Sequence, residues 1–297
     1  MGIKVIAAVL LVSLMFHTGL QINRGQLMTI LKSHGLIGRA LLANFIIVPI
    51  LGVLLVHAFA LNDSNATGFL LMAISPGVPF LVLSGGEKKH GSVELAVTLA
   101  LLLPLVSVVT VPLTAELILP VDETSRITAT QLVLSLGLFQ LLPLLFGILV
   151  NTRTPKIGQY VERPVGIVVL IAMALVLWVL YGPLTASITT IYGSRGMLAA
   201  LALTFLSLVI GYALGGPQPE TRRTLSIGTN LRNVGLALTI ASTSFSADRL
   251  IGAAALSYLL VQFLMSVAAG FAFGREIRPI RDIVRFLLGE DIRPGLR

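Results

Sequence analysis

The sequence predicts an all-α protein that crosses a membrane many times. Of its 297 residues, 56% are hydrophobic and only 11% are charged, and its mean hydropathy is +0.95. Soluble domains are much more polar than this. Apolar stretches of about 20 residues, the length that spans a bilayer as a helix, follow one another along nearly the whole chain. This pattern leaves no room for a separate soluble domain.

Nine apolar segments make up the pattern, and turn formers and charges separate them. The segments cover residues 3–22, 35–60, 66–84, 92–118, 128–150, 164–182, 196–215, 222–243 and 248–273. Clear connections precede segments three, four, five and eight, at Asn62–Asn65, Gly85–Lys89, Asp122–Glu123 and Gly215–Pro217 respectively. The first segment lacks a small-residue cleavage site, so we interpret it as a membrane helix and not as a signal peptide. We therefore expect nine transmembrane helices.

Basic residues are concentrated on one side of these expected helices. That side carries Arg24, Lys32, Arg39, Lys88, Lys89, Arg153, Lys156, Arg163, Arg222, Arg223 and the basic tail, whereas the opposite side carries only Lys4, Arg126, Arg195 and Arg249. Cytoplasmic loops of membrane proteins are rich in Lys and Arg, so the first side is expected to be cytoplasmic. The protein would then lie in a plasma membrane of the bacterial inner-membrane type, with its N-terminus outside and its C-terminus inside. The net charge of +8 reflects this bias and does not indicate nucleic-acid binding.

Two of the segments are interrupted by residues that membrane helices avoid. The third contains Ser75-Pro76-Gly77-Val78-Pro79, and the eighth contains Gly228-Thr229-Asn230-Leu231-Arg232-Asn233. An unwound backbone at membrane depth persists only where it is buried in protein or lines a cavity. The first interruption also fits a simple proline kink, and the second also fits a continuous helix with a packed polar face. We favour two unwound breaks, because such pairs mark the binding sites of transporters.

The positions of the two breaks suggest an internal repeat. Segments one to four match segments six to nine, and the matching segments are an odd number of spans apart. The two halves would therefore have opposite orientations in the membrane, as in an inverted-topology repeat. In such a repeat the two breaks meet near the membrane midplane and form one shared site.

Several short motifs resemble those of the bile acid:sodium symporter family. They are Met15-Phe16-His17-Thr18-Gly19-Leu20, Asn44-Phe45 with Pro49, Ser75-Pro76-Gly77, and the stretch from Thr224 to Ala237. The resemblance covers nearly the whole chain, although the family usually has Cys-Pro-Gly-Gly at the first break. The family usually has ten helices, and the resemblance implies that this chain begins at the second.

The resemblance implies a membrane transporter domain over residues 1–274 and a cytoplasmic basic tail over 275–297. A core domain would comprise about 35–118 and 196–273, with the broken helices crossing inside it, and a panel domain about 3–22 and 128–182. A small organic anion would bind between the two, and rocking would give alternating access.

The chain departs from the family where the resemblance places sodium. The family's Ser-Asn pair falls at Leu81-Val82, its glutamate at Gly228 and a nearby glutamine at Arg232. A guanidinium repels a cation, so these departures argue against sodium coupling. Asn44, Thr229 and Asn230 are the remaining candidate sodium ligands.

Arg232 is the most informative of the candidate site residues. It lies nine residues beyond Arg223, about 14 Å along a helix, where a charge is costly and usually functional. It would replace the cation and bind a carboxylate or sulfonate, or it would pair with backbone carbonyls that the break frees.

The other expected substrate-binding residues surround the breaks. They are Ser75, Pro76, Gly77, Pro79, Thr229, Asn230, Asn233, Gln262 and His17. His17 and Glu94 are titratable, but a helical histidine is more often a packed residue, and Glu94 fits a charged helix end. Gln262 would contact substrate or join two helices.

We therefore expect a secondary transporter of a small organic anion that is not coupled to sodium. A sodium symporter with relocated ligands and a membrane-embedded sensor are the alternatives. The chain has no cysteine and none of the usual hydrolase motifs, so neither an enzyme nor a cofactor is expected. The sequence leaves the substrate, the coupling ion and the oligomeric state open.

Overall fold

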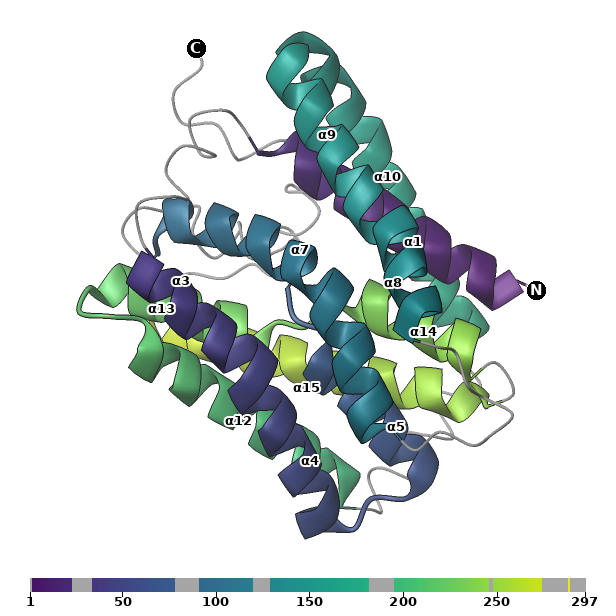
Figure 1. The fold of residues 1–297 in the computed structure, drawn as a ribbon, viewed down its shortest axis with the longest axis vertical. Coiled ribbons are helices and arrows are strands. Elements are labelled where there is room, and N and C mark those ends of the chain that lie inside the picture. The colour runs from purple at the N-terminus through teal and green to yellow at the C-terminus, as the bar shows by residue number, and fades with distance from the viewer. Residues whose placement is uncertain are drawn as a thin grey trace.

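The computed structural model describes residues 2–22, 34–77, 91–119, 129–181, 195–245, 248–273 and 288. Within these ranges the ordered elements are helices. They are α1 (Gly2–Leu20), α3 (His34–Leu42), η1 (Ala43–Ile47), α4 (Val48–Phe59), α5 (Asp63–Ile74), α7 (Val93–Ile118), α8 (Ala129–Leu136), η3 (Gly137–Leu141), α9 (Leu142–Arg153), α10 (Pro155–Val179), α12 (Gly196–Leu214), α13 (Pro219–Asn230), α14 (Val234–Ser244) and α15 (Arg249–Ala272) (Figure 1). The predicted all-α fold is confirmed.

Seven described helical stretches are long and apolar enough to cross a membrane. They are Ile3–Leu20, His34–Phe59, Val93–Ile118, Ala129–Arg153, Pro155–Val179, Gly196–Leu214 and Leu250–Ala272. They correspond to the seven predicted segments that carry no break. The total of nine spans and the inverted repeat remain predictions. The tail over 275–297 lies outside the described residues apart from Leu288.

The connection between segments five and six was predicted wrongly. The sequence suggested a loop from about 150 to 164, but α9 continues to Arg153 and α10 begins at Pro155, so only Thr154 separates them. Proline suits the first position of a helix, where its missing N–H leaves no unsatisfied donor. Pro164 lies inside α10, since membrane helices tolerate interior prolines.

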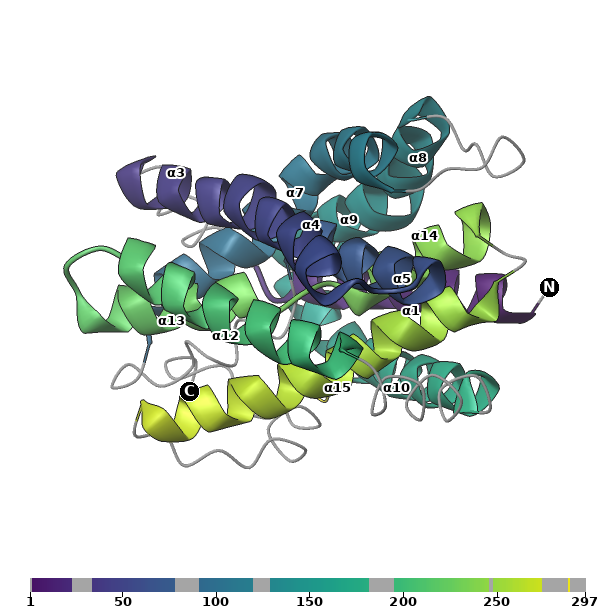
Figure 2. The same ribbon diagram turned by 90° about the horizontal axis from the view of Figure 1, so that it is seen from below.

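Helix packing brings distant parts of the chain together. Helix α1 packs against α9, α10 and α14, and α12 packs against α4, α13 and α15 (Figure 1). Helix α5 packs against α4 and α15, and α15 runs beneath α12 in Figure 2. The division into a core and a panel domain is consistent with these contacts but remains a prediction.

Two of the long spans contain a short π-helical stretch next to a proline. Pro49 follows η1 and Pro143 follows η3, each within the first turn of the next helix. A proline has no N–H to donate to the carbonyl four residues earlier, so the helix locally widens. Each π-helical stretch holds a fully buried amide side chain, Asn44 in η1 and Gln140 in η3.

Exposed apolar and aromatic side chains cover the outside of the helices. On α10, the rings of Tyr160 and Trp178 are 81% and 80% exposed. They are about 27 Å apart along a helix, close to the thickness of about 30 Å of a bilayer's hydrocarbon core. Tyr and Trp favour the two membrane–water interfaces, so these two rings fit both edges of a membrane.

Helices α1 and α9 touch through two glycines. A Cβ atom added to Gly147 would lie 2.9 Å from Gly19 Cα and 2.9 Å from the Leu20 nitrogen, and closer still to the carbonyl oxygen of Phe16. These are backbone atoms, which cannot move aside without shifting the helix. The two glycines therefore set the distance between α1 and α9.

Replacing Gly147 with alanine is expected to destabilise the protein by about 1–3 kcal/mol, because the added methyl group overpacks this contact. Thermal unfolding in detergent measures the effect. Gly137→Ala is the matched control, since a Cβ there meets nothing within 4 Å. An equal unfolding temperature for the two variants would contradict the assignment.

Candidate functional site

The two predicted breaks are present, and they contact each other. Helix α5 ends at Ile74 before the unwound residues Ser75–Gly77, and residues 231–233 separate α13 from α14. Pro76 and Arg232 form an isolated antiparallel bridge, and the Asn233 N–H donates to the Ser75 carbonyl at 2.9 Å. Val78 and Pro79 lie outside the described residues. The crossing, which we define as Ser75–Gly77 with Leu231–Asn233, thus joins segments that are more than 150 residues apart.

The unwound backbone finds hydrogen-bond partners inside the protein. The Arg232 N–H donates to Oε1 of Gln262 at 2.9 Å, and the Leu231 N–H donates to the Ile227 carbonyl at 2.9 Å. The Asn233 side chain caps α14, because its Oδ1 accepts from the Leu236 N–H at 3.0 Å. Unpaired backbone groups in an apolar interior are costly, so these bonds allow the break to exist at this depth.

Gly77 fits its position for two reasons. Its φ is +90°, in the left-handed region that favours glycine. A Cβ there would also lie 2.9 Å from Leu103 Cβ and 3.2 Å from Pro104 Cδ on α7. The first break therefore rests directly against the middle of α7.

Arg232 is one of the largest fully buried side chains, with 1% exposure. Its Nη2 donates to the Thr229 carbonyl at 2.6 Å, in the last turn of α13. The C-terminus of a helix carries a partial negative charge, so the guanidinium is favourably placed there. Among the described residues, no carboxylate pairs with Arg232, and its Nε and Nη1 have no hydrogen-bond partner.

Asn230 and Gln262 connect the crossing to α15. Nδ2 of Asn230 donates to Ser266 Oγ at 2.8 Å and to the Gln262 carbonyl at 3.3 Å. Gln262, through its bond to the Arg232 N–H, joins α15 to the unwound stretch between α13 and α14. Ser266 was not predicted, because a serine in an apolar helix gives no distinctive signal.

Several buried polar atoms at the crossing have no partner within the described ranges. They are Ser75 Oγ, Thr229 Oγ1, Asn230 Oδ1 and Asn233 Nδ2, besides the two guanidinium nitrogens. Buried polar groups are nearly always hydrogen-bonded, so such a concentration calls for a partner. Apart from the Asn230 amide oxygen, which can only accept, the set consists of N–H and O–H groups and includes a cation, which is the chemistry that binds an oxyanion.

Two predicted residues belong to helices other than those that the breaks interrupt. Asn44 is buried in η1, where its Nδ2 donates to the Ala40 carbonyl of its own span at 2.9 Å. No hydrogen bond between described residues joins it to Thr229 or Asn230, the other candidate sodium ligands. His17 is fully buried in α1, which packs against α14.

The sequence interpretation missed Gln140. This side chain is fully buried in η3, and its Nε2 donates to the Pro104 carbonyl at 2.8 Å and to Ser107 Oγ at 2.7 Å. It thereby holds η3 against the same part of α7 that Gly77 contacts. A polar amide three residues before a proline in an apolar segment was the signal that pointed to it.

Comparison with known proteins identifies the family. The family model described as the sodium bile acid symporter family matches residues 8–193, which is more than half of the chain and includes the first break but not the second. The motifs of the first half lie within this range.

Individual relatives are distant. The chain is 25% identical over 248 residues to "Probable sodium/metabolite cotransporter BASS3, chloroplastic" of Oryza sativa subsp. japonica, covering 80% of this chain and 57% of the relative. It is 26% identical to the human "P3 protein", covering 69% of this chain and 43% of the relative. It is 25% identical to "Sodium-dependent organic anion transporter" of Bos taurus, covering 83% and 66%.

The chain thus spans roughly half to two thirds of the length of these relatives. Its apolar helices and the family match agree on a multi-pass integral membrane protein. With more than half of its residues matched by the family model, the chain belongs to the sodium bile acid symporter family.

Proposed function

We propose that this protein is a secondary transporter, not an enzyme, that carries a small organic anion by alternating access without sodium coupling. The observation that carries the proposal is Arg232, a buried guanidinium at the crossing that pairs with no carboxylate among the described residues. The transporter family to which the chain belongs supports the general class.

The energetic argument starts from the cost of burying a charge. A buried cation needs a counter-charge and hydrogen-bond acceptors for its donors. The Thr229 carbonyl supplies one acceptor, while Nε and Nη1 remain available within the described part of the chain. A carboxylate or sulfonate would accept from the N–H groups that are left and neutralise the charge. Arginine suits this task because its planar fork matches an oxyanion.

The same contact supports the absence of sodium coupling. Sodium prefers several oxygen ligands, and the Thr229 carbonyl is one of the oxygens that a site at the break would offer. In this protein that oxygen already accepts a hydrogen bond from the guanidinium. A second cation at this place would be repelled by the first. We infer that Arg232 acts as a tethered cation in the position that the family resemblance assigns to sodium.

A sodium-coupled anion symporter is the second candidate. The printed names of two relatives include sodium, and three buried side-chain oxygens, on Asn44, Thr229 and Asn230, have no partner among the described residues. Those oxygens would have to gather around one ion. The Thr229 carbonyl at the break already accepts from the Arg232 guanidinium, which favours the sodium-independent proposal.

We place the N-terminus outside and the C-terminus inside a plasma membrane of the bacterial inner-membrane type. Basic residues at the ends of helices support this orientation, because Arg153 and Lys156 lie on either side of the connection between α9 and α10. Arg222 and Arg223 similarly follow the turn between α12 and α13. Both connections would face the cytoplasm by the positive-inside rule.

Alternating access requires the predicted panel to move against the predicted core. Gln140 of η3 and Pro104 of α7 lie on the two sides of that division, and their hydrogen bond joins them in the present conformation. Pro104 also contacts Gly77 of the first break. We infer that a change at the crossing reaches the panel through this contact, and that the bond breaks during transport.

Organic carboxylates or sulfonates are expected to raise the unfolding temperature of the purified protein, and the rise should be equal in sodium and in potassium chloride. Uptake of the best ligand into proteoliposomes should saturate and should not depend on a sodium gradient. Strong sodium dependence would overturn the coupling claim. Binding without any flux would favour the membrane-embedded sensor.

Arg232→Gln is expected to weaken binding of that anion about tenfold to a hundredfold, the value of a charge-assisted hydrogen-bonded contact. The unfolding temperature without ligand should not fall, because the change removes a buried charge that lacks a carboxylate partner. Arg39→Gln, at an exposed arginine, is the matched control and should bind normally. Unchanged binding and stability in Arg232→Gln would exclude both the substrate role and the structural role.

Gln140→Leu is expected to change the ratio of the two transport conformations about fivefold, because it removes hydrogen bonds worth about 1 kcal/mol between η3 and α7. The absence of native cysteines allows spin labels at Lys156→Cys and Gln218→Cys, whose distance distribution reports the ratio. Gln159→Leu, at an exposed glutamine of α10, should leave the distribution unchanged. An identical distribution in both variants would contradict this role for Gln140.

A further inference from the structure

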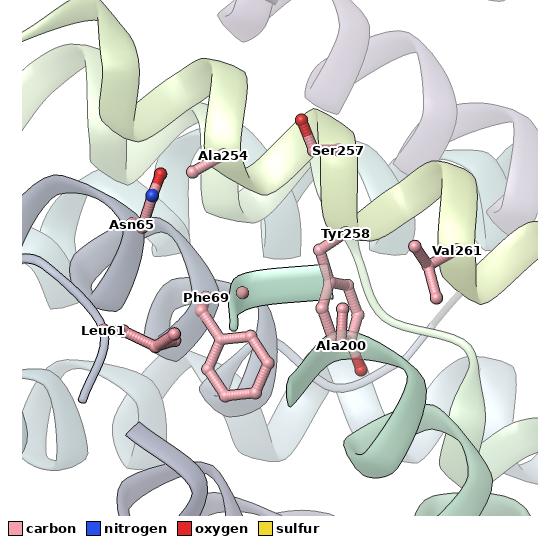
Figure 3. Close-up of a pocket in the computed structure, with 9 residues that line it drawn as sticks. Leu61, Asn65, Phe69, Ala200, Ala254, Ser257, Tyr258 and Val261 are labelled. Carbon is pink, nitrogen blue, oxygen red and sulfur yellow. The ribbon is translucent and has the colours of Figure 1, made fainter. Parts of the chain in front are cut away.

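A pocket lies between α5, α12 and α15, away from the division between the predicted panel and core. Its lining includes Asn65 and Phe69 of α5, Ala200 of α12, and Ala254 and Tyr258 of α15 (Figure 3). Its empty volume is about 320 Å³, counting the open mouth. The lining is mainly apolar, with a few polar groups.

The pocket is at the end of the molecule where all three helices begin. Asn65 is in the first turn of α5, and the pocket reaches Gly196, the first residue of α12. Under the proposed orientation this end faces outward. The pocket would then be accessible from the outside.

One face of α15 leads from this pocket to the crossing. Ala254, Tyr258, Gln262 and Ser266 are four residues apart and so lie one above another on a helix. The first two line the pocket, whereas Gln262 and Ser266 bind the Arg232 N–H and Asn230. Tyr258 is therefore the residue between the pocket and the crossing on this face.

An aromatic pair lies at this inner position. The rings of Phe69 and Tyr258 are 5.6 Å apart and nearly perpendicular, at 80°. Figure 3 shows the two rings side by side, with Ala200 next to Tyr258. Tyr258 is 2% exposed, and its hydroxyl has no hydrogen-bond partner among the described residues. A buried phenol normally bonds to something, so this donor is available for a ligand.

The charges near the pocket favour an anion. Arg232 is the fully buried charge beyond Tyr258, and no hydrogen bond joins it to the phenol among the described residues. Asp63 and Asp248 stand at the starts of α5 and α15. The Asp248 carboxylate already accepts bonds from Ser64 Oγ and the Leu250 N–H, which satisfies its oxygens locally. Both carboxylates stand at the starts of the helices, whereas the guanidinium is buried beyond Tyr258, so an anion that enters the pocket meets a positive charge at its inner end.

We infer that this pocket is an outer entry subsite for the carboxylate or sulfonate group of a small organic anion, and that Phe69 and Tyr258 close it from the crossing. The Tyr258 hydroxyl donates a hydrogen bond to the anionic group, and Arg232 attracts it. The inference rests on the proposed function for the choice of ligand, but its test does not require transport.

The absence of cysteine makes the test direct. Ala200→Cys places a thiol in the pocket, and the purified protein is reacted with the anionic reagent sulfonatoethyl methanethiosulfonate and with its cationic trimethylammonioethyl counterpart. The ratio of the two rates, divided by the ratio for β-mercaptoethanol, measures the preference for an anion. We expect a preference of about tenfold, because the buried charge attracts one reagent and repels the other.

Three variants complete the experiment. Adding Arg232→Gln to Ala200→Cys should remove the anion preference while the thiol remains reactive. Benzoate should slow the reaction of Ala200→Cys by occupying the pocket. Adding Tyr258→Phe should weaken this protection without changing the unfolding temperature. Leu198→Cys, on the exposed apolar face of α12, should react with neither reagent in liposomes.

An unreactive Ala200→Cys, or a rate ratio equal to that of β-mercaptoethanol, would overturn the subsite. Anion preference and benzoate protection without uptake would leave the subsite standing and overturn the proposed transport. Uptake without anion preference at Ala200→Cys would overturn the subsite and support the proposed transport.

Discussion

The constraint on which the structure depends is that lipid cannot satisfy an unwound backbone. Two chain segments lose their helical bonds at the crossing, and each becomes a partner of the other through the Asn233 N–H and the Ser75 carbonyl. Gln262 supplies the next acceptor from α15. The surrounding helices keep these polar groups away from lipid. Glycines such as Gly77, Gly19 and Gly147 allow close packing around them.

The second consequence of the crossing is electrostatic. Helix α13 ends at the crossing, so its last carbonyls present a partial negative charge inside the protein. Arg232, three residues after Thr229, neutralises part of that charge by donating a hydrogen bond to the Thr229 carbonyl. A cation that belongs to the chain does not leave during a transport cycle, which is the physical difference between a tethered guanidinium and a bound ion.

The crossing is also connected to both sides of the molecule. Gly77 contacts Pro104 of α7, and Gln140 holds the Pro104 carbonyl from η3. In the other direction, Gln262 and Tyr258 follow one face of α15 toward the pocket. A small displacement of the unwound segments would therefore act on contacts in both directions, since packed interiors transmit such shifts.

The sequence by itself determined the fold class, the two breaks and the burial of Arg232, because apolar length, Pro-Gly pairs and a charge within an apolar segment are local signals. Only the tertiary structure showed that residues 75 and 233 bond, that Gln140 and Tyr258 lie near the crossing, and that α10 begins at Pro155. Which partner a buried amide or phenol faces depends on helix packing between distant segments, and a single sequence carries no such pairing information. The placement of Pro79 and the proposed repeat remain predictions of the sequence alone.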